Sequence, residues 1–281
     1  MLFNSLPNET PPQIAETQVG YPVEKTDVRA ESAMPNTLDE TDLPGNQSPN
    51  DSGSVDDEKG LKELEGRLAG VFLEQEIRNT LGPDDVILLR AMLNDPQDFK
   101  TWARVCKALC ILESSTDTVL LLQEYISRFE DFRETKNENI LLGKAMAPIF
   151  LGHMEDKELA LTHLEKLATH EGAKDALKGW DAAELEGAGL GLDLDLFLLL
   201  IRRGAYYGLA RVNTDAAQQA LNLEYAKFRN KFIDEGGLSD YELRASYAVC
   251  EALGEFNGIR ELGRDEYLEV DPIVWTRDRV S

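Results

Sequence analysis

The chain is short of cysteine, of long apolar runs and of basic residues, and each shortage excludes a class of protein. Its 281 residues include three cysteines, Cys106, Cys110 and Cys250, an odd and sparse set that favours a reducing compartment over a disulfide framework. The longest apolar stretch, near residues 194–201, is far too short to cross a bilayer. The first residues, MLFNSLPNETPPQ, lack the features of a secretory signal or a transit peptide, so we expect an intracellular protein, cytoplasmic or nuclear.

Basic side chains are outnumbered along the whole chain. There are 52 acidic and 29 basic residues, which gives a formal net charge of −23. A surface of this sign repels phosphate, so the composition argues against nucleic acid and anionic membrane as partners. A protein partner with a basic or apolar surface is compatible with this charge.

Residues 1–60 are predicted to form a disordered, acidic tail rich in Pro, Ser and Asn. Seven of the eleven prolines precede Gly60, and the only aromatic residues there are Phe3 and Tyr21. Such a segment cannot bury enough apolar surface to offset the entropy of ordering it. Three uses for the tail stay open: a linker, a segment regulated by phosphorylation, and an export signal for a bacterial injection apparatus.

From Leu61 to residue 270, apolar side chains recur at helical spacing, which predicts an all-α domain. Glu171–Gly172 and Gly236–Gly237 are expected to end helices, and Ser239 with Glu242 forms a capping-box pattern. The predicted helices pair in sequence order: 98–112 with 117–131, 138–152 with 156–170, and 194–211 with 215–233, followed by a helix from 240 to 254.

Two arrangements of these helices are consistent with the sequence. Pairs that recur at about forty residues are typical of helical-hairpin arrays, whereas an irregular helical bundle needs no repeat. The glycine-rich stretch near 172–192 behaves as an insertion between two pairs. Residues 271–281 leave the helical pattern and predict an extended segment with Trp275 as an anchor, against the body or a second chain.

The sequence offers no strong metal or cofactor site. Cys106 and Cys110 lie four residues apart, a spacing that can present two thiolates to one ion, but a zinc site needs two further ligands. Both cysteines fall within an apolar stripe, where free cysteine is a common core residue. We therefore expect no metal and no cofactor.

An enzymatic alternative centres on residues 187–195. Three glycines there resemble a phosphate-binding loop by number alone, since no Lys-Ser/Thr pair follows them. A site in this region would use Asp193, Asp195 or His163 as its titratable groups.

Bases and aromatic residues meet at one place in this acidic chain, between Ile201 and Arg211. One interpretation is internal ion pairing, with the aromatic rings in the core. The other is a docking surface, because tyrosine and arginine are favoured anchors at protein interfaces. The residues predicted to bind a partner are Arg202, Arg203, Tyr206, Tyr207, Arg211 and Trp275.

The leading functional expectation is a non-enzymatic protein–protein interaction module that acts as an adaptor, regulator or chaperone-like scaffold. Three alternatives stay open: an enzyme with its site near 187–195, a secreted regulator or effector of a bacterial export system, and an RNA-binding helical repeat.

Overall fold

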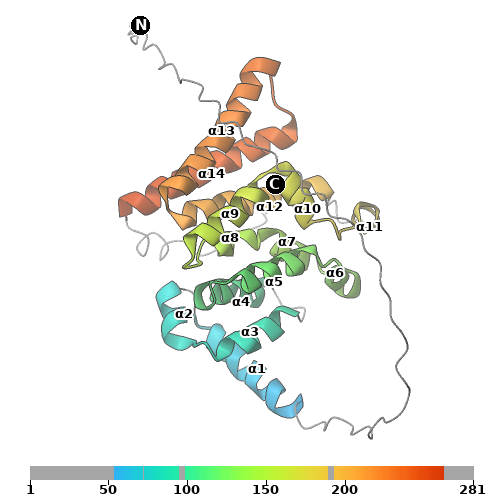
Figure 1. Ribbon diagram of the computed structural model, residues 1–281. Helices are drawn as coiled ribbons and strands as arrows, with labels where there is room; N and C mark the ends of the chain where they lie inside the picture. The colour runs from blue at the N-terminus through green and yellow to red at the C-terminus, as the bar shows by residue number, and fades with distance from the viewer. Residues whose placement is uncertain (1–53, 72, 95–98, 189–192, 263–281) are drawn as a thin grey trace, which may run out of the picture. The chain divides into compact units, whose positions relative to one another are not determined.

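The computed structural model describes residues 54–71, 73–94, 99–188 and 193–262, and Figure 1 shows their arrangement. Within these ranges every regular element is a helix and there is no strand, which confirms the predicted all-α fold. The helices are α1 (Ser54–Leu68), α2 (Glu74–Thr80), α3 (Asp85–Asn94), α4 (Phe99–Leu112), α5 (Thr116–Ser127), α6 (Glu130–Thr135), α7 (Glu138–Met146), α8 (Pro148–Leu151), α9 (Lys157–Ala168), α10 (His170–Ala176), α11 (Ala182–Gly187), α12 (Leu194–Val212), α13 (Asp215–Glu235) and α14 (Asp240–Leu262).

The predicted helix pairs appear at their predicted places, with differences in their bounds. The predicted helices 117–131 and 138–152 are each divided in two, as α5 with α6 and α7 with α8, and the last helix continues beyond 254 to Leu262. The first helix begins at Ser54, six residues before Gly60; residues 1–53 and 263–281 lie outside the described residues. The helix end predicted at Glu171–Gly172 is wrong. Thr169 caps a new helix there, and its hydroxyl accepts a hydrogen bond from the Gly172 amide at 3.0 Å, so α9 ends at Ala168.

Local sequence signals explain where the last helices begin and end. Thr214 accepts a hydrogen bond from the Ala217 amide at 3.2 Å and caps α13. Gly236 ends that helix with φ +76°, a backbone conformation that glycine adopts without a Cβ clash. Ser239 and Glu242 form the predicted capping box, since each side chain accepts a hydrogen bond from the other residue's backbone amide.

The helix α12 is the centre of the bundle. It packs against α7, α8, α9, α10, α13 and α14, which are spread over the second half of the chain. These helices belong to the preceding predicted pair, to the partner of α12 and to the helix that follows, so their contacts are consistent with both expected arrangements.

Two glycines allow α12 to lie very close to the end of α8. A Cβ atom at Gly152 would lie 2.4 Å from the Gly208 carbonyl oxygen, and one at Gly208 would lie 2.6 Å from a methyl carbon of Leu164. Backbone therefore meets backbone at this crossing, and a larger residue at Gly152 has no flexible neighbour to displace.

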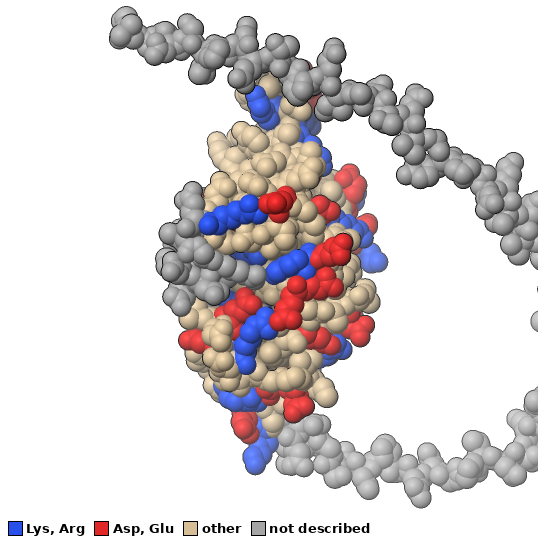
Figure 2. All heavy atoms as spheres, turned by 60° about the vertical axis from the view of Figure 1, so that its left-hand side comes forward, with Lys and Arg blue, Asp and Glu red and all other residues tan. Residues whose placement is uncertain are grey.

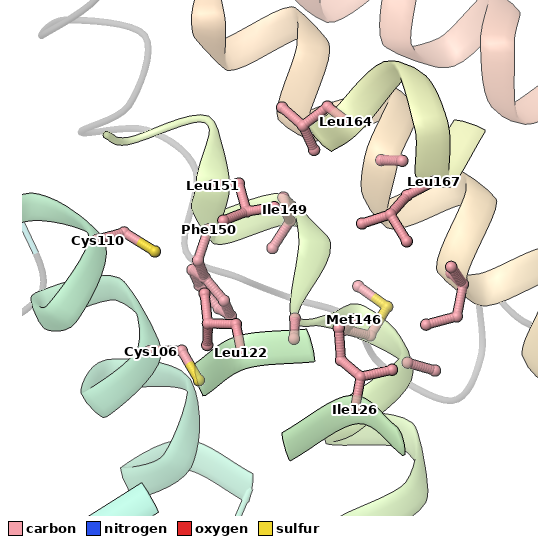
Figure 3. Close-up of a cluster of buried hydrophobic side chains, with 14 of the residues drawn as sticks. Cys106, Cys110, Leu122, Ile126, Met146, Ile149, Phe150, Leu151, Leu164 and Leu167 are labelled. Atoms are coloured by element: carbon pink, nitrogen blue, oxygen red, sulfur yellow. The ribbon is translucent and has the colours of Figure 1, made fainter. Parts of the chain in front are cut away.

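The core contains the two neighbouring cysteines. Cys106 and Cys110 are fully buried on α4, and Figure 3 shows their side chains pointing toward Phe150 and Leu122. Burial raises the pKa of both thiols, which keeps them protonated. Over the ranges described, no three His, Cys, Asp or Glu side chains are grouped to hold a metal ion.

Lys144 and Asp131 form a charged pair inside the core. The ammonium group of Lys144 is fully buried, donates to the Tyr125 carbonyl at 2.7 Å and lies 2.7 Å from an Asp131 carboxylate oxygen. It also lies 4.0 Å from the centre of the Tyr125 ring. Burial lowers the pKa of Lys144 to about 8, against the opposing effect of Asp131.

None of the described helices combines the length and the apolar content that crossing a bilayer requires.

Candidate interaction surface

The guanidinium of Arg202, one of the predicted docking residues, points into the bundle. It donates from Nε to the Ala168 carbonyl at 2.9 Å and from Nη2 to the Tyr206 hydroxyl at 2.7 Å. Further contacts reach Glu224 at 3.5 Å and the Tyr241 hydroxyl at 3.4 Å. Arg202 thereby ties α12 to the end of α9, to α13 and to α14.

Arg203, Tyr207 and Arg211, the other predicted residues of α12, form contacts with α14. Arg211 and Glu255 form an ion pair at 2.9 Å with both side chains buried. Glu251 accepts hydrogen bonds from Arg203 at 2.9 Å and from the Tyr207 hydroxyl at 3.2 Å. Burial, and then the charge of Glu251, raises the pKa of Tyr207 to about 12.

These contacts correspond to internal ion pairing, the first of the two interpretations of this basic segment. Arg202, Tyr206 and Arg211 are buried and offer no surface to a partner. Arg203 and Tyr207 are partly exposed and both donate hydrogen bonds to Glu251 on α14. Trp275 lies outside the described residues.

Exposed apolar side chains gather instead on the two helices that α12 holds in place. In the part of the chain that the structure describes, six of the eight large exposed hydrophobic residues belong to α13 and α14. Phe232, Ile233 and Tyr247 are each more than half exposed, at 58%, 63% and 62%. The full set is Ile87, Leu120, Leu223, Tyr225, Phe232, Ile233, Leu243 and Tyr247.

Helical spacing distributes the exposed residues of α13 over more than one side of that helix. Tyr225 and Phe232 lie four residues after the buried Leu221 and Phe228, and Ile233 lies farther round the helix. On α14 the buried positions include Val249, and the opposite side is exposed. The two helices form a hairpin that packs against α12. We call the following exposed residues of this hairpin the outer hairpin face: Tyr225, Arg229, Phe232, Ile233, Leu243, Tyr247 and Cys250.

The members of the outer hairpin face include no carboxylate, but charged residues adjoin them at helical spacing. Asp240 lies three residues before Leu243, Glu251 four residues after Tyr247, and Glu235 three residues after Phe232. Figure 2 shows acidic and basic side chains interleaved over much of one side of the molecule, with a broad uncharged area at the height at which Figure 1 shows α13 and α14.

Arg229 is the single charge of this face. Among the described residues, none forms an ion pair with it, whereas the neighbouring Lys227 and Lys231 pair with Glu224 and Glu242. The Lys231–Glu242 pair, at 2.5 Å, joins the ends of α13 and α14. The hydrogen bond from Lys231, with that from the Ser239 amide, lowers the pKa of Glu242 to about 2.

A shallow hollow lies on the other side of α13, next to α9. It has a volume of about 240 Å³, and Leu223 is its exposed apolar residue. A second hollow of about 400 Å³ lies between α5, α9 and α10. Neither hollow is lined by any residue between 187 and 195.

The residues of the enzymatic alternative have structural roles. Asp193 caps α12 by accepting a hydrogen bond from the Leu196 amide at 2.7 Å, and Asp195 is exposed in the first turn. His163 Nδ1 lies 3.2 Å from the Gln123 amide nitrogen, and burial, followed by the charge of Lys166, lowers its pKa. Over the ranges described, no hydrogen bond or ion pair joins His163 to either aspartate.

Sequence reasoning missed the outer hairpin face, although a signal for it was present. Leu223 and Ile233 depart from the stripe that runs through Leu221, Tyr225, Phe228 and Phe232, so α13 has apolar side chains on more than one side. In a helix packed on one side only, such residues mark a second surface.

Comparisons with family models, with curated proteins and with solved structures give no match to this chain.

Proposed function

We propose that this protein is a non-enzymatic interaction module that binds a partner protein through the outer hairpin face. The observation that carries the proposal is that six of the eight large exposed hydrophobic residues of the described chain lie on one helical hairpin, α13 and α14. Exposed apolar patches of this kind are typical of protein interaction sites.

The chemistry of the face indicates what the partner presents. Tyr225, Phe232 and Tyr247 are large amphipathic or apolar anchors, and each stabilises a complex through the apolar area it removes from water. Arg229 adds a cation with no ion pair among the described residues. The fitting partner surface is therefore apolar, with a carboxylate placed to meet Arg229.

Ion pairs next to the outer hairpin face hold its two helices in place. Buried ion pairs from Arg202 and Arg211 hold α13 and α14 against α12, and the Lys231–Glu242 pair joins their ends. A surface that is ordered before binding loses less conformational entropy on association.

A capture experiment with matched variants tests the proposal. Full-length protein carrying a tag is used to isolate partners from cells of its source, together with the variants Phe232→Glu/Tyr247→Glu and Ile87→Glu. Ile87 is 76% exposed on α3, so its variant places the same charge on another exposed apolar site. We expect one partner to be recovered by the wild type and by Ile87→Glu and to fall at least tenfold with the double variant.

Equal recovery of every partner by all three proteins would contradict the proposal. Circular dichroism of each variant should show unchanged helix content, because the substituted side chains are exposed.

A further inference from the structure

We propose that the partner of the outer hairpin face is a second copy of this chain, which binds through α14 in an antiparallel, two-fold symmetric pair centred near Tyr247. This inference rests on the proposed function, since it names the partner of the same surface. The observation that carries it is the order of charged and apolar residues along the exposed side of α14.

Two opposite charges flank Tyr247 on this side. Arg244 lies three residues before Tyr247 and Glu251 four residues after it, so the three side chains follow one another along one side of the helix. Among the described residues, none forms an ion pair with Arg244, which is exposed. The Glu251 side chain is 52% exposed, and the hydrogen bonds that it accepts from Arg203 and Tyr207 both end at its Oε2 atom.

A two-fold axis near Tyr247 makes these charges complementary. In an antiparallel pair, Tyr247 of one copy lies opposite Tyr247 of the other, and Arg244 lies opposite Cys250. Glu251 is one residue farther along, a rise of ~1.5 Å, so Arg244 of each copy comes beside Glu251 of the other. Because the interface is isologous, the ion pair forms twice, once on each side of the paired tyrosines.

The apolar residues follow the same symmetry. Leu243 lies four residues before Tyr247 and is 42% exposed, and Cys250 lies three residues after Tyr247 and is also exposed. The same axis brings Leu243 of one copy beside Cys250 of the other. A parallel pair would instead place Arg244 beside Arg244 and Glu251 beside Glu251, and such like-charge contacts are unfavourable.

The negative charge of the chain is compatible with this contact. Each copy carries a net charge of −23, but the Debye length is ~8 Å at about 0.15 M salt, so repulsion between distant charges is screened. Asp240 lies seven residues before Tyr247, and the axis brings it level with Gly254 of the other copy, which carries no charge.

Two charge reversals test the arrangement in the full-length chain. Arg244→Glu places two carboxylates together at each contact, and Glu251→Arg places two guanidinium groups together. In sedimentation velocity the wild type should dimerise, and each variant should dimerise at least tenfold more weakly. An equimolar mixture of the two variants has an opposite-charge pair at both contacts, so it should form a heterodimer with an affinity within about threefold of the wild type.

Three results of this experiment would overturn the inference: a wild type that stays monomeric as its concentration is raised, a dimer that neither variant weakens, and a mixture of folded variants that stays monomeric. Circular dichroism establishes that the variants are folded. If Glu251→Arg loses helix content, the disulfide experiment decides alone.

The disulfide experiment locates the axis. In Tyr247→Cys/Cys250→Ser the two introduced thiols meet at the axis, so copper–phenanthroline with dioxygen, which takes up their two electrons and two protons, should link two chains. The matched control Ile87→Cys/Cys250→Ser, with its thiol at a 76% exposed position on α3, should stay unlinked. Wild-type Cys250 should also stay unlinked, because six residues, or ~9 Å along the helix, separate it from its counterpart. No link in the first variant, or equal linking of the control, would overturn the inference.

Failure of the inference is distinguishable from failure of the proposed function. A monomeric wild type, together with capture of a different protein that depends on Phe232 and Tyr247, would overturn the inference and leave the proposed function intact.

Discussion

At the scale of single residues, the most informative side chain is Arg202. In the sequence it belongs to a group of bases and aromatics with two interpretations, internal pairing and docking. Its position on α12 turns it toward Tyr206 and Glu224, where it satisfies buried polar groups of three helices. A buried cation of this kind stabilises the fold through its partners, because removal of one member leaves the other without a charge partner in the core.

Replacing Arg202 by methionine should lower the free energy of unfolding by about 3 kcal/mol, because Glu224 loses its buried cationic partner and the Ala168 carbonyl keeps the Tyr206 hydroxyl but loses the Arg202 donor. Arg229→Met is the matched control, an arginine on the neighbouring helix α13 that is exposed and should change stability by less than about 0.5 kcal/mol. Urea unfolding followed by circular dichroism measures both values. Similar losses in the two variants would contradict the role assigned to Arg202.

The second prediction at this scale concerns the pH dependence that Lys144 contributes. Its folded-state pKa, about 8, is below the usual value of 10.5, so between these pH values the unfolded chain binds more protons than the folded chain. The contribution of Lys144 to the free energy of unfolding therefore rises with pH across that window and is lost as the pH falls through 8.

Urea unfolding of the wild type and of Lys144→Met between about pH 7.5 and 10 isolates this contribution, since all other titrating groups are shared. The difference in unfolding free energy, wild type minus variant, should increase with pH, with a slope of at most about 1.4 kcal/mol per pH unit. A difference that stays constant or decreases across this range would show that Lys144 titrates normally.

At the scale of helices, close backbone contact decides which positions tolerate a side chain. Gly152→Ala should destabilise the protein by about 2 kcal/mol, because the new methyl group would meet the Gly208 carbonyl oxygen, which is backbone. Gly254→Ala is the matched control. Nothing lies within 4 Å of its added Cβ, and it sits inside α14, so alanine should stabilise the helix by about 0.5–1 kcal/mol.

Thermal unfolding of both variants tests the pair. The melting temperature should fall for Gly152→Ala and rise for Gly254→Ala. A rise for Gly152→Ala would mean that α8 and α12 can separate without cost, contrary to the described packing.

Helix positions were largely predictable from the sequence, and the reasons are local. The stop at Gly236 and the capping box at Ser239 and Glu242 depend on side chains within a few residues of the helix end, and both were predicted correctly. The boundary at Thr169 was missed because the glycine at 172 suggested an end, whereas the threonine hydroxyl begins a new helix. Packing partners such as Gly152 and Gly208 lie 56 residues apart, and no local pattern joins them.

At the scale of the whole described body, the central helix determines which surfaces stay open. Apolar periodicity in the sequence predicts that a helix packs against others. It does not predict how many sides of the helix its neighbours cover. α12 is surrounded, and its bases meet internal acids, whereas α13 and α14 are held on one side and expose the other. For this reason Arg202, Tyr206 and Arg211, which were predicted to dock a partner, are internal, whereas the exposure of α13 and α14 follows from their packing.

The central claim is that the outer hairpin face is where this protein binds its partner. Hydroxyl-radical labelling of the full-length protein, free and in complex with the captured partner, tests it most directly. Binding should reduce labelling of Phe232 and Tyr247 by at least threefold relative to the free protein, while Ile87 and Leu120 keep their labelling. Protection of Ile87 or Leu120 with Phe232 and Tyr247 still labelled in the complex would contradict the account.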